Sequence, residues 1–290
     1  MDLFSKEYQE HVRKMRKKFF ETGSAEGITS VRPEVLDCWK EAFLSEVRPD
    51  NAKKESVSPA ELSAAVAASA ELLAVAEPYM QLLNGFLEPD SFWVGLMDHN
   101  GVILRLVGSP AMLKLARSTN LIEGSYRGGE MSYPGLYNTC LKIDRPFQIV
   151  SGEHPSSVDD ALAGTAAPIH DADTGMSLGV IGISGYWEKS HGHTMGLTIM
   201  AAEAIAKEMK LQRRLRENGL LSVDKIEVGK HRGAISAPKY SKEAEELLSL
   251  LRQHQGNVSE AARAMGVSRP TVYRKLKKYG INSIGKWLFI

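Results

Sequence analysis

The stretch GNVSEAARAMGVSRPTVYRKLKKYGI, residues 256–281, carries the start and stop signals of two short helices. Asn257 is a favourable N-cap residue, and Glu260 follows at the spacing of a capping box, so the first helix should begin near Val258. Gly266 then provides the left-handed residue that commonly ends a helix. The first half of the stretch is therefore expected to form one short helix followed at once by a turn.

A second helix is expected to begin directly after that turn. Ser268 is placed to cap it, and Pro270 is tolerated because the N–H groups of a first helical turn have no helical acceptors. Gly280 would end the helix. An apolar stripe at helical spacing consists of Val272, Leu276 and Tyr279. Two helices joined by such a short turn make a helix-turn-helix.

The outer face of the second helix is basic. Its members are Arg269, Thr271, Arg274, Lys275, Lys277 and Lys278. No carboxylate occurs between Ser268 and Gly280, whereas the whole chain has a net charge of only +1, so positive charge is concentrated near the C-terminus. This face suits the phosphates and base edges of DNA, and an ordinary solvated helix is the weaker interpretation.

Residues 256–282 resemble the C-terminal module of the factor for inversion stimulation, the Fis family. The shared features, all in register, are GN, AA, MG, Arg269, Thr271 and the run KLKKYG. The resemblance implies a unit of three helices, the first of which spans residues 241–255. Its inward-facing residues would be Leu247, Leu248 and Leu251.

The same resemblance implies roles for individual residues. Arg269 and Arg274 would read bases. The backbone phosphates would be held by Asn257, Ser259, Thr271, Lys275 and Lys278. Ser268 is a further candidate DNA contact, but it departs from the Fis pattern together with Pro270 and Tyr273. The preferred DNA sequence is therefore expected to differ from that of Fis.

A module of about forty residues rarely buries enough apolar surface to be stable and bind tightly alone. One recognition helix also covers only half of a typical binding site. A two-fold dimer that reads two half-sites about one helical turn apart is the common solution. We therefore expect a homodimer that binds double-stranded DNA, at an operator that is palindromic.

The composition is that of a globular protein, with 43% hydrophobic and 24% charged residues, and the length of 290 residues suggests two domains. No apolar run approaches the about 18 residues that a membrane span requires, so we expect no membrane association and a cytoplasmic location. Two cysteines are too few for a disulfide scaffold. The N-terminal residues predict an amphipathic helix with Phe4, Tyr8, Val12, Met15 and Phe19 on one side, for packing or dimer contact.

The body of the chain predicts an α+β fold. Its clearest strands form two turn-linked pairs, residues 92–97 with 102–107 and residues 164–169 with 178–184. Helical signals occupy residues 59–83, 110–117, 132–142 and 193–216. We expect a mostly antiparallel sheet with helices on one side, followed by the all-α helix-turn-helix.

Residues 28–210 resemble the GAF-type sensor region of acetoin-catabolism-type activators, a group of bacterial enhancer-binding proteins. The matching segments, in order, are VRPEVLDCW at 31–39, DHNGVIL at 98–104, EH at 153–154, AAPIHDADTG at 166–175, LGVIGISG at 178–185 and HTMGLTIMAAEAI at 193–205. The resemblance implies a GAF-like domain that binds a small effector. One departure is YPGLYNTCL at 133–141, where the family commonly has a GTNAIGTAL-like run, so the effector is expected to differ.

A second departure concerns the ATPase that such activators carry between sensor and Fis module. Only about 25 residues separate the long helix ending near Arg216 from Ser241, too few for that domain. The nearest imitation of a P-loop, residues 182–190, has Glu188 where glycine is needed. ATP-dependent activation of sigma-54 polymerase is therefore not expected. The expected division is an N-terminal helical region at 1–57, a sensor at 58–212, a linker at 213–240 and a DNA-binding domain at 241–290.

The candidate effector-binding residues are Trp93, Tyr126, Tyr133, Tyr137 and Asn138. Aromatic side chains with a few polar groups are typical of small-ligand sites, although plain core packing is an equal alternative. A neutral or aromatic metabolite fits better than a phosphate compound, because no glycine-rich cradle with clustered arginines is present. We expect no cofactor and no metal, since the spacing of His154, His170, His191 and His193 does not place two of them on one helical face.

Three functional hypotheses remain. The preferred one is a ligand-responsive, sequence-specific transcription regulator that acts by contacting or blocking RNA polymerase and has no catalytic residues. The second is a constitutive Fis-like architectural DNA-binding protein. The third is a GAF-type redox enzyme that uses Cys140, but its position late in an apolar helix favours a buried, inert thiol.

Overall fold

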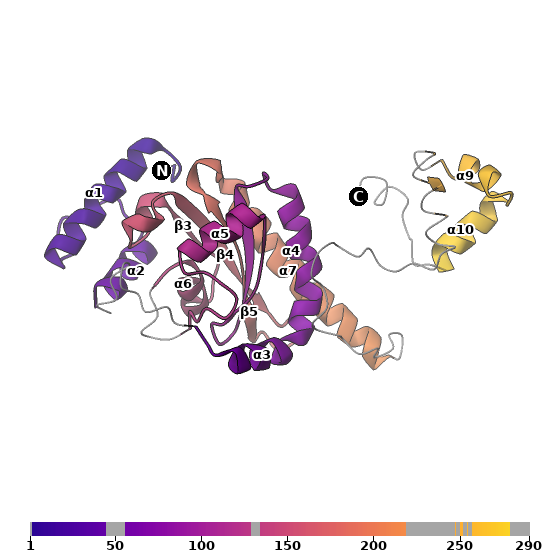
Figure 1. Ribbon diagram of the computed structural model, residues 1–290, viewed down its shortest axis with the longest axis horizontal. Helices are drawn as coiled ribbons and strands as arrows, with labels where there is room; N and C mark the ends of the chain where they lie inside the picture. The colour runs from indigo at the N-terminus through magenta and orange to yellow at the C-terminus, as the bar shows by residue number, and fades with distance from the viewer. Residues whose placement is uncertain are drawn as a thin grey trace. The chain divides into compact units, whose positions relative to one another are not determined.

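The computed structural model describes residues 2–44, 56–128, 134–218 and 257–278, together with positions 247, 250, 251 and 254; of the helix ending at Lys278, the last three side chains lie outside this description. The chain divides into two units, residues 1–230 and 231–290. The first unit contains the sheet, and the second contains the helix-turn-helix (Figure 1).

The first unit is built on one five-stranded antiparallel sheet. Its strands are β1 (Phe92–Asp98), β2 (Ile103–Gly108), β3 (Phe147–Val150), β4 (Leu162–His170) and β5 (Ser177–Tyr186). Their order is β2-β1-β5-β4-β3, with every neighbouring pair antiparallel. The α+β prediction and both strand pairs are confirmed. Only β3 was not anticipated from the sequence.

Helices cover both faces of the sheet, so the expectation of helices on one side is wrong. One face carries α3 (Pro59–Ala68), α4 (Ala70–Phe86) and α7 (Gly192–Glu217), and the other carries α5 (Pro110–Ser118) and α6 (Leu136–Ile143). The reason lies in β1, where all seven residues are buried. A strand without polar alternation needs cover on both sides.

The N-terminal helices α1 (Lys6–Thr22) and α2 (Pro33–Leu44) pack on each other. Their shared core consists of Tyr8, Val12, Phe19, Val35 and Trp39, with Met15 against it. The amphipathic stripe expected from the sequence is thus used for packing within the chain.

The loop that follows β3 begins with two short 3-10 helices, η2 (Ser151–Glu153) and η3 (Ser157–Asp159), before β4. A third, η4 (Trp187–Lys189), leads from β5 towards α7. The chain therefore passes within a few residues from β5, the middle strand of the sheet, to α7, which covers one face of the sheet.

Helix α7 ends at Glu217, one residue beyond the helix expected at 193–216, and so includes the first residues of the expected linker at 213–240. Two of its last arginines form ion pairs that stabilise this end of the helix. Arg216 contacts Glu71 of α4 at 3.0 Å, while Arg213 pairs with both Glu71 and Asp171.

No single helix in the described part of the chain has both the length and the apolar composition to cross a membrane. Helices α3 and α4 satisfy the criterion only when taken together, and they meet at a bend of 86°. The buried residues of α4 pack against the sheet.

Candidate functional site

The second unit contains α9 (Val258–Ala264) and α10 (Arg269–Lys278), the two helices expected from the sequence. The Asn257 side chain caps α9 by accepting from the N–H of Ser259 at 3.1 Å and of Glu260 at 3.4 Å. The capping box does not form. The N–H of Asn257 donates to the carbonyl of His254 instead, and the Glu260 carboxylate pairs with the His254 ring at 3.2 Å.

The turn between the helices has the expected glycine. Gly266 adopts a φ of 65°, and the next N–H, of Val267, donates to the carbonyl of Ala262 at 3.0 Å. This pattern is that of a Schellman motif. Ser268 differs from its expected role, because its hydroxyl bonds the Thr271 hydroxyl at 2.9 Å.

A small apolar core fixes the angle between the two helices. It consists of Leu247, Leu251, Val258, Ala261, Ala262 and Val272. Small alanines on α9 allow Val272 of α10 to be fully buried between them. Leu248, Tyr279 and the side chain of Leu276 lie outside the described residues. The contacts of α9 with α10 therefore support the helix-turn-helix geometry.

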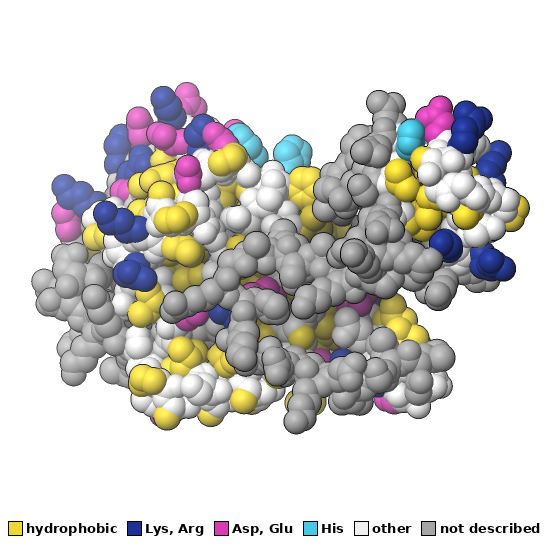
Figure 2. Space-filling model, turned by 45° about the vertical axis from the view of Figure 1, so that its right-hand side comes forward, with side chains coloured by type: hydrophobic (Ala, Val, Ile, Leu, Met, Phe, Trp, Pro, Cys, Tyr) yellow, Lys and Arg dark blue, Asp and Glu magenta, His cyan; other side chains and the backbone are white. Residues whose placement is uncertain are grey.

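Several exposed side chains of this unit are basic. Arg269 and Arg274 are exposed, and so is Tyr273 between them, while Lys275 and Thr271 are partly exposed. Asn257 and Ser268 are exposed and Ser259 is partly exposed. Figure 2 shows dark blue arginine and lysine side chains around this unit. The Lys278 side chain lies outside the described residues. The described part of this unit therefore offers solvent-accessible cations and hydroxyl groups, which can bind DNA phosphates.

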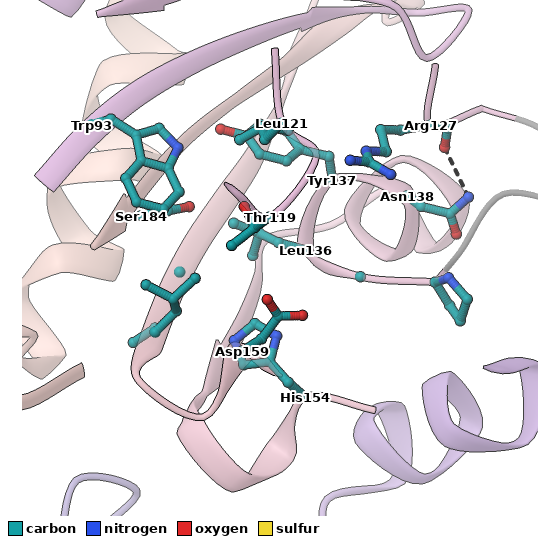
Figure 3. Close-up of a pocket in the computed structure, with 15 residues that line it drawn as sticks. Trp93, Thr119, Leu121, Arg127, Leu136, Tyr137, Asn138, His154, Asp159 and Ser184 are labelled. Atoms are coloured by element: carbon teal, nitrogen blue, oxygen red, sulfur yellow. Dashed lines mark hydrogen bonds between the residues drawn. The ribbon is translucent and has the colours of Figure 1, made fainter. Parts of the chain in front are cut away.

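The first unit contains a small cavity of about 110 Å³ between the sheet, α6 and the loop after β3. Its walls include Trp93, Leu121, Arg127, Tyr137, Asn138, His154, Asp159 and Ser184 (Figure 3). For comparison, an engineered cavity of about 150 Å³ binds benzene. The space therefore suits a molecule of a few heavy atoms.

Three polar atoms in the cavity walls have no hydrogen-bond partner. They are Nε1 of Trp93, the hydroxyl of Tyr137 and Nε2 of His154, all shielded from solvent. Buried polar atoms without partners are uncommon in native proteins. Because all three residues line one cavity, a polar molecule bound there could complete their hydrogen bonding.

Glycines shape the floor under Tyr137. Gly95 of β1 and Gly182 of β5 are register partners, and a Cβ atom at either would come within 2.3 Å and 2.8 Å of the Tyr137 hydroxyl. The Tyr137 phenol therefore packs against the sheet at a place where glycine is needed at both positions to leave room for it. Burial raises the pKa of Tyr137. The nearby Ser184 hydroxyl offsets part of this rise, although the two groups do not reach hydrogen-bond geometry.

The loop after β3 supplies His154 and Asp159, which lie next to each other in the cavity wall (Figure 3). Burial lowers the pKa of His154, so its imidazole is neutral at pH 7. Burial also raises the pKa of Asp159, against the influence of His154 and Arg127. Asn138 donates to the Arg127 carbonyl at 2.8 Å and closes the wall on the other side.

The N-terminal helices hold this loop in place. Arg16 of α1 binds both carboxylate oxygens of Asp160, at 2.5 and 3.0 Å, and donates to the His154 carbonyl at 3.0 Å. Arg32 binds both oxygens of the buried Glu153, at 2.8 and 2.6 Å. The position of the cavity wall therefore depends on α1 and α2.

Three of the five expected effector-binding residues, Trp93, Tyr137 and Asn138, line the cavity. Tyr126 does not, because it forms an isolated bridge with Val102 beside β2. Tyr133 lies outside the described residues. The sequence analysis named His154 only as a histidine whose spacing does not favour a metal site, and it did not consider Asp159. The signal for His154 was present, since the EH dipeptide belongs to the segments that resemble the sensor family.

Cys140 is fully buried in α6, and its thiol lies 3.5 Å from the Arg145 carbonyl. Burial raises the pKa of Cys140 to about 12, so the thiol stays protonated at neutral pH. It does not line the cavity. Within the described ranges, no three His, Cys, Asp or Glu side chains converge as metal ligands would.

Comparisons with known proteins agree with both halves of this description. Residues 242–279 match the model for "Bacterial regulatory protein, Fis family". The acetoin dehydrogenase operon transcriptional activator AcoR of Bacillus subtilis is 30% identical over 193 residues, 66% of this chain. A signal-transduction and transcriptional-control protein of Clostridium beijerinckii is 25% identical over 50% of this chain.

This chain covers 32% and 23% of the length of those two relatives. Among solved structures, the Escherichia coli DhaR(N)–DhaL complex matches with a TM-score of 0.57 and 15% identity, over 65% of this chain and 64% of that one. The likeness shows that the first unit shares its fold with that structure. The chain thus combines such a fold with a Fis-type helix-turn-helix, and residues 218–241 between them are too few for an ATPase domain.

Proposed function

We propose that this protein is a homodimeric transcription regulator whose binding to DNA responds to a small molecule in the cavity. The sensor would comprise residues 58–212 and the DNA-binding domain residues 241–290. The observation that carries the proposal is the helix-turn-helix geometry of α9 and α10 with exposed arginines on α10. The match of residues 242–279 to Fis-family regulators supports it.

On DNA, α10 would enter the major groove with Arg269 and Arg274 directed at base edges. Asn257, Ser259, Ser268, Thr271, Lys275 and Lys278 would contact the backbone. Each arginine that forms a bidentate contact with guanine contributes about 1–3 kcal/mol of discrimination. Two copies would read the two halves of a palindromic operator. Its place of action would be the cytoplasm, where bacterial DNA lies, with RNA polymerase contacted or blocked from the operator.

The effector would be small, uncharged and oxygen-containing. Trp93 Nε1 can only donate a hydrogen bond, whereas the Tyr137 hydroxyl and the neutral His154 ring can donate or accept. A molecule with a carbonyl and a hydroxyl group would pair with all three. The Bacillus relative is named for an acetoin dehydrogenase operon, and acetoin, a four-carbon hydroxyketone, is therefore the first compound to test.

DNA binding is tested by selecting sites from a random pool with the full-length protein, then measuring affinity by gel shift. We expect Arg269→Ala to weaken binding to the selected site by about 5- to 150-fold, from the loss of about 1–3 kcal/mol. Arg117→Ala, an exposed arginine on α5, is the matched control and should bind like the wild type. Equal affinity of both variants would exclude base reading by Arg269.

Effector binding is tested by thermal shift with acetoin and related small hydroxyketones and diols. At a ligand concentration of 100 Kd, stabilisation of about 2.7 kcal/mol should raise the melting temperature by about 5–10 °C. Trp93→Phe, which removes the indole N–H, should reduce the shift, whereas Trp187→Phe should leave it unchanged. A regulator also requires the ligand to change DNA affinity. A protein whose DNA affinity ignores every bound ligand would instead be a constitutive architectural binder.

A further inference from the structure

Helix α7 has two apolar faces, and the sheet covers only one of them. The covered face carries Thr194, Thr198, Ala201, Ala202, Ile205 and Met209, all buried. On the other side, Leu197, Met200 and Leu211 are exposed, with Met200 at 69% of its full accessibility. A helix that is apolar on two sides is normally covered on two sides.

The neighbouring helix α4 repeats this arrangement. Its exposed positions are Ala74, Pro78, Leu82, Gly85 and Phe86, at helical spacing and without a single charge. Phe86 is 81% exposed, which is unusual for a phenylalanine in a monomeric protein. A solvent-facing stripe that contains no polar side chain indicates a surface that is buried in the working protein.

The two exposed stripes lie beside each other. Glu71, at the start of α4, pairs with Arg213 and Arg216 near the end of α7, so the helices run antiparallel (Figure 1). It follows that Leu82 and Phe86 lie towards the end of α4 that faces the start of α7, where Leu197 and Met200 are. We call these stripes together the α4–α7 outer face.

We propose that the α4–α7 outer face is where a second copy of this chain docks. The inference rests on the proposed function in one respect, because a helix-turn-helix is expected to act as a pair. Helix α7 leads directly into residues 218–241 and then into the DNA-binding segment. Two copies joined along α7 would bring two such segments to one operator.

The spacing on α7 fits a helix–helix contact. Leu197, Met200, Ala204 and Leu211 follow the intervals of three, four and seven residues that place side chains on a coiled-coil seam, and Lys207 occupies the seam position between the last two. Gly85 and Gly196 have nothing within 4 Å of a Cβ position, so helices can approach closely there. These are the features of a surface that packs on another helix.

The charges on and beside the seam favour self-association over a charged partner. Glu203 and Lys207 are exposed on α7 and pair with each other at 3.3 Å. Equal numbers of opposite charges allow one face to meet its own copy about a two-fold axis without net repulsion. This face has no excess of one charge that would attract a partner with a strongly charged surface.

The size of the face is adequate for a dimer. Helix α7 has 26 residues and α4 has 17, so they are about 39 and 25 Å long. With a width of about 10 Å for each helix, they present roughly 600–700 Å². A stable interface needs about 800 Å² per partner, and the exposed alanines of α3 can supply the remainder.

The test measures the mass of the full-length protein by sedimentation equilibrium, without DNA. The variant is Met200→Glu, which places a carboxylate in the proposed interface. The matched control is Met176→Glu, since Met176 is 68% exposed but lies on the turn between β4 and β5. We expect a wild-type dimer, a dissociation constant raised at least about tenfold by Met200→Glu, and no change from Met176→Glu. Circular dichroism checks that both variants are folded.

A monomeric wild type, or a dimer that Met200→Glu leaves intact, would overturn the proposal. A monomer in which Met200→Glu increases DNA affinity would show instead that the chain's own DNA-binding unit covers this face. These results are separate from a failure of the proposed function, which would appear as absent DNA binding in a wild-type protein of any mass. If both proposals hold, Met200→Glu should also weaken binding to a two-half-site operator more than to a single half-site.

Discussion

Replacing Glu153 with alanine should destabilise the first unit more than any surface substitution. The carboxylate is fully buried and accepts from four donors: Tyr8 Oη at 2.7 Å, Arg32 Nε and Nη2 at 2.8 and 2.6 Å, and the Val150 N–H at 2.9 Å. Removing it leaves the guanidinium of Arg32 without its counter-charge. Breaking a buried pair in this way costs about 3–5 kcal/mol.

Smaller substitutions should cost less, in a defined order. Tyr8→Phe removes one hydrogen bond to a charged acceptor, for about 1.5–3 kcal/mol. Glu153→Gln retains one acceptor oxygen but directs an amide N–H₂ at groups that are themselves donors, so its cost should fall between those of Tyr8→Phe and Glu153→Ala. The costs of Tyr8→Phe and of a Glu153 substitution should not be additive in a double variant, since both substitutions remove the Tyr8–Glu153 hydrogen bond.

The assay is urea unfolding of the full-length protein, followed by near-ultraviolet circular dichroism. Trp39 contributes to this signal and contacts the substituted residue directly, since its Nε1 donates to the Glu153 carbonyl at 2.7 Å. For a unit of this size, about 3–5 kcal/mol corresponds to a fall in melting temperature of about 6–20 °C. Glu10→Ala, on the exposed side of α1, is the control. If Glu153→Ala lowered the free energy of unfolding by less than about 1 kcal/mol, no more than Glu10→Ala does, the reasoning would be refuted.

Three further predictions address other parts of the molecule. Gly182→Ala should displace Tyr137 and cost about 1–3 kcal/mol in urea unfolding, whereas Gly192→Ala, with nothing within 4 Å, should be neutral or better. Arg213, with help from the Thr174 N–H, holds the pKa of Asp171 well below its usual range. The stability that ionised Asp171 contributes is therefore complete above about pH 4 and is lost as the pH falls below that value. Asp171→Asn should flatten this acid part of a curve of stability against pH. Lys275→Ala should weaken specific and non-specific DNA binding to a similar extent and lower the slope of log affinity against log salt by about one unit, a result that fluorescence anisotropy at several salt concentrations would check.

The elements that could be predicted from the sequence are those whose signals are local. Asn257 marks the start of α9 and Gly266 follows its end, and both act through the backbone groups of their immediate neighbours. The alternation of strand and turn residues at 92–107 likewise defines β1 and β2 without reference to the rest of the chain. In contrast, β3 has only four residues, too few for a clear periodic signal. Its pairing with β4 identifies it only in the folded chain.

The candidate cavity was predictable only in part, because its walls meet through distant contacts. Trp93 and Tyr137 stood out as aromatic residues near polar ones. His154 reaches the cavity because Arg16, 138 residues away along the chain, binds its carbonyl. The room for Tyr137 depends likewise on the register that places Gly95 opposite Gly182, and register is a property of the assembled sheet.

The contacts that Arg16 and Arg32 make with β3 and the loop after it, which we call the N-terminal clamp, also affect the edge of the sheet. Strand β3 lies at one edge, where Arg32 Nη2 donates to the Gln148 carbonyl and Glu153 accepts the N–H of Val150. These side chains occupy backbone groups that another strand could otherwise pair with. Loss of the clamp would therefore do more than lower stability: it would open a short template for strand addition between molecules. Variants that loosen α1 or α2 should accumulate as aggregates before they unfold.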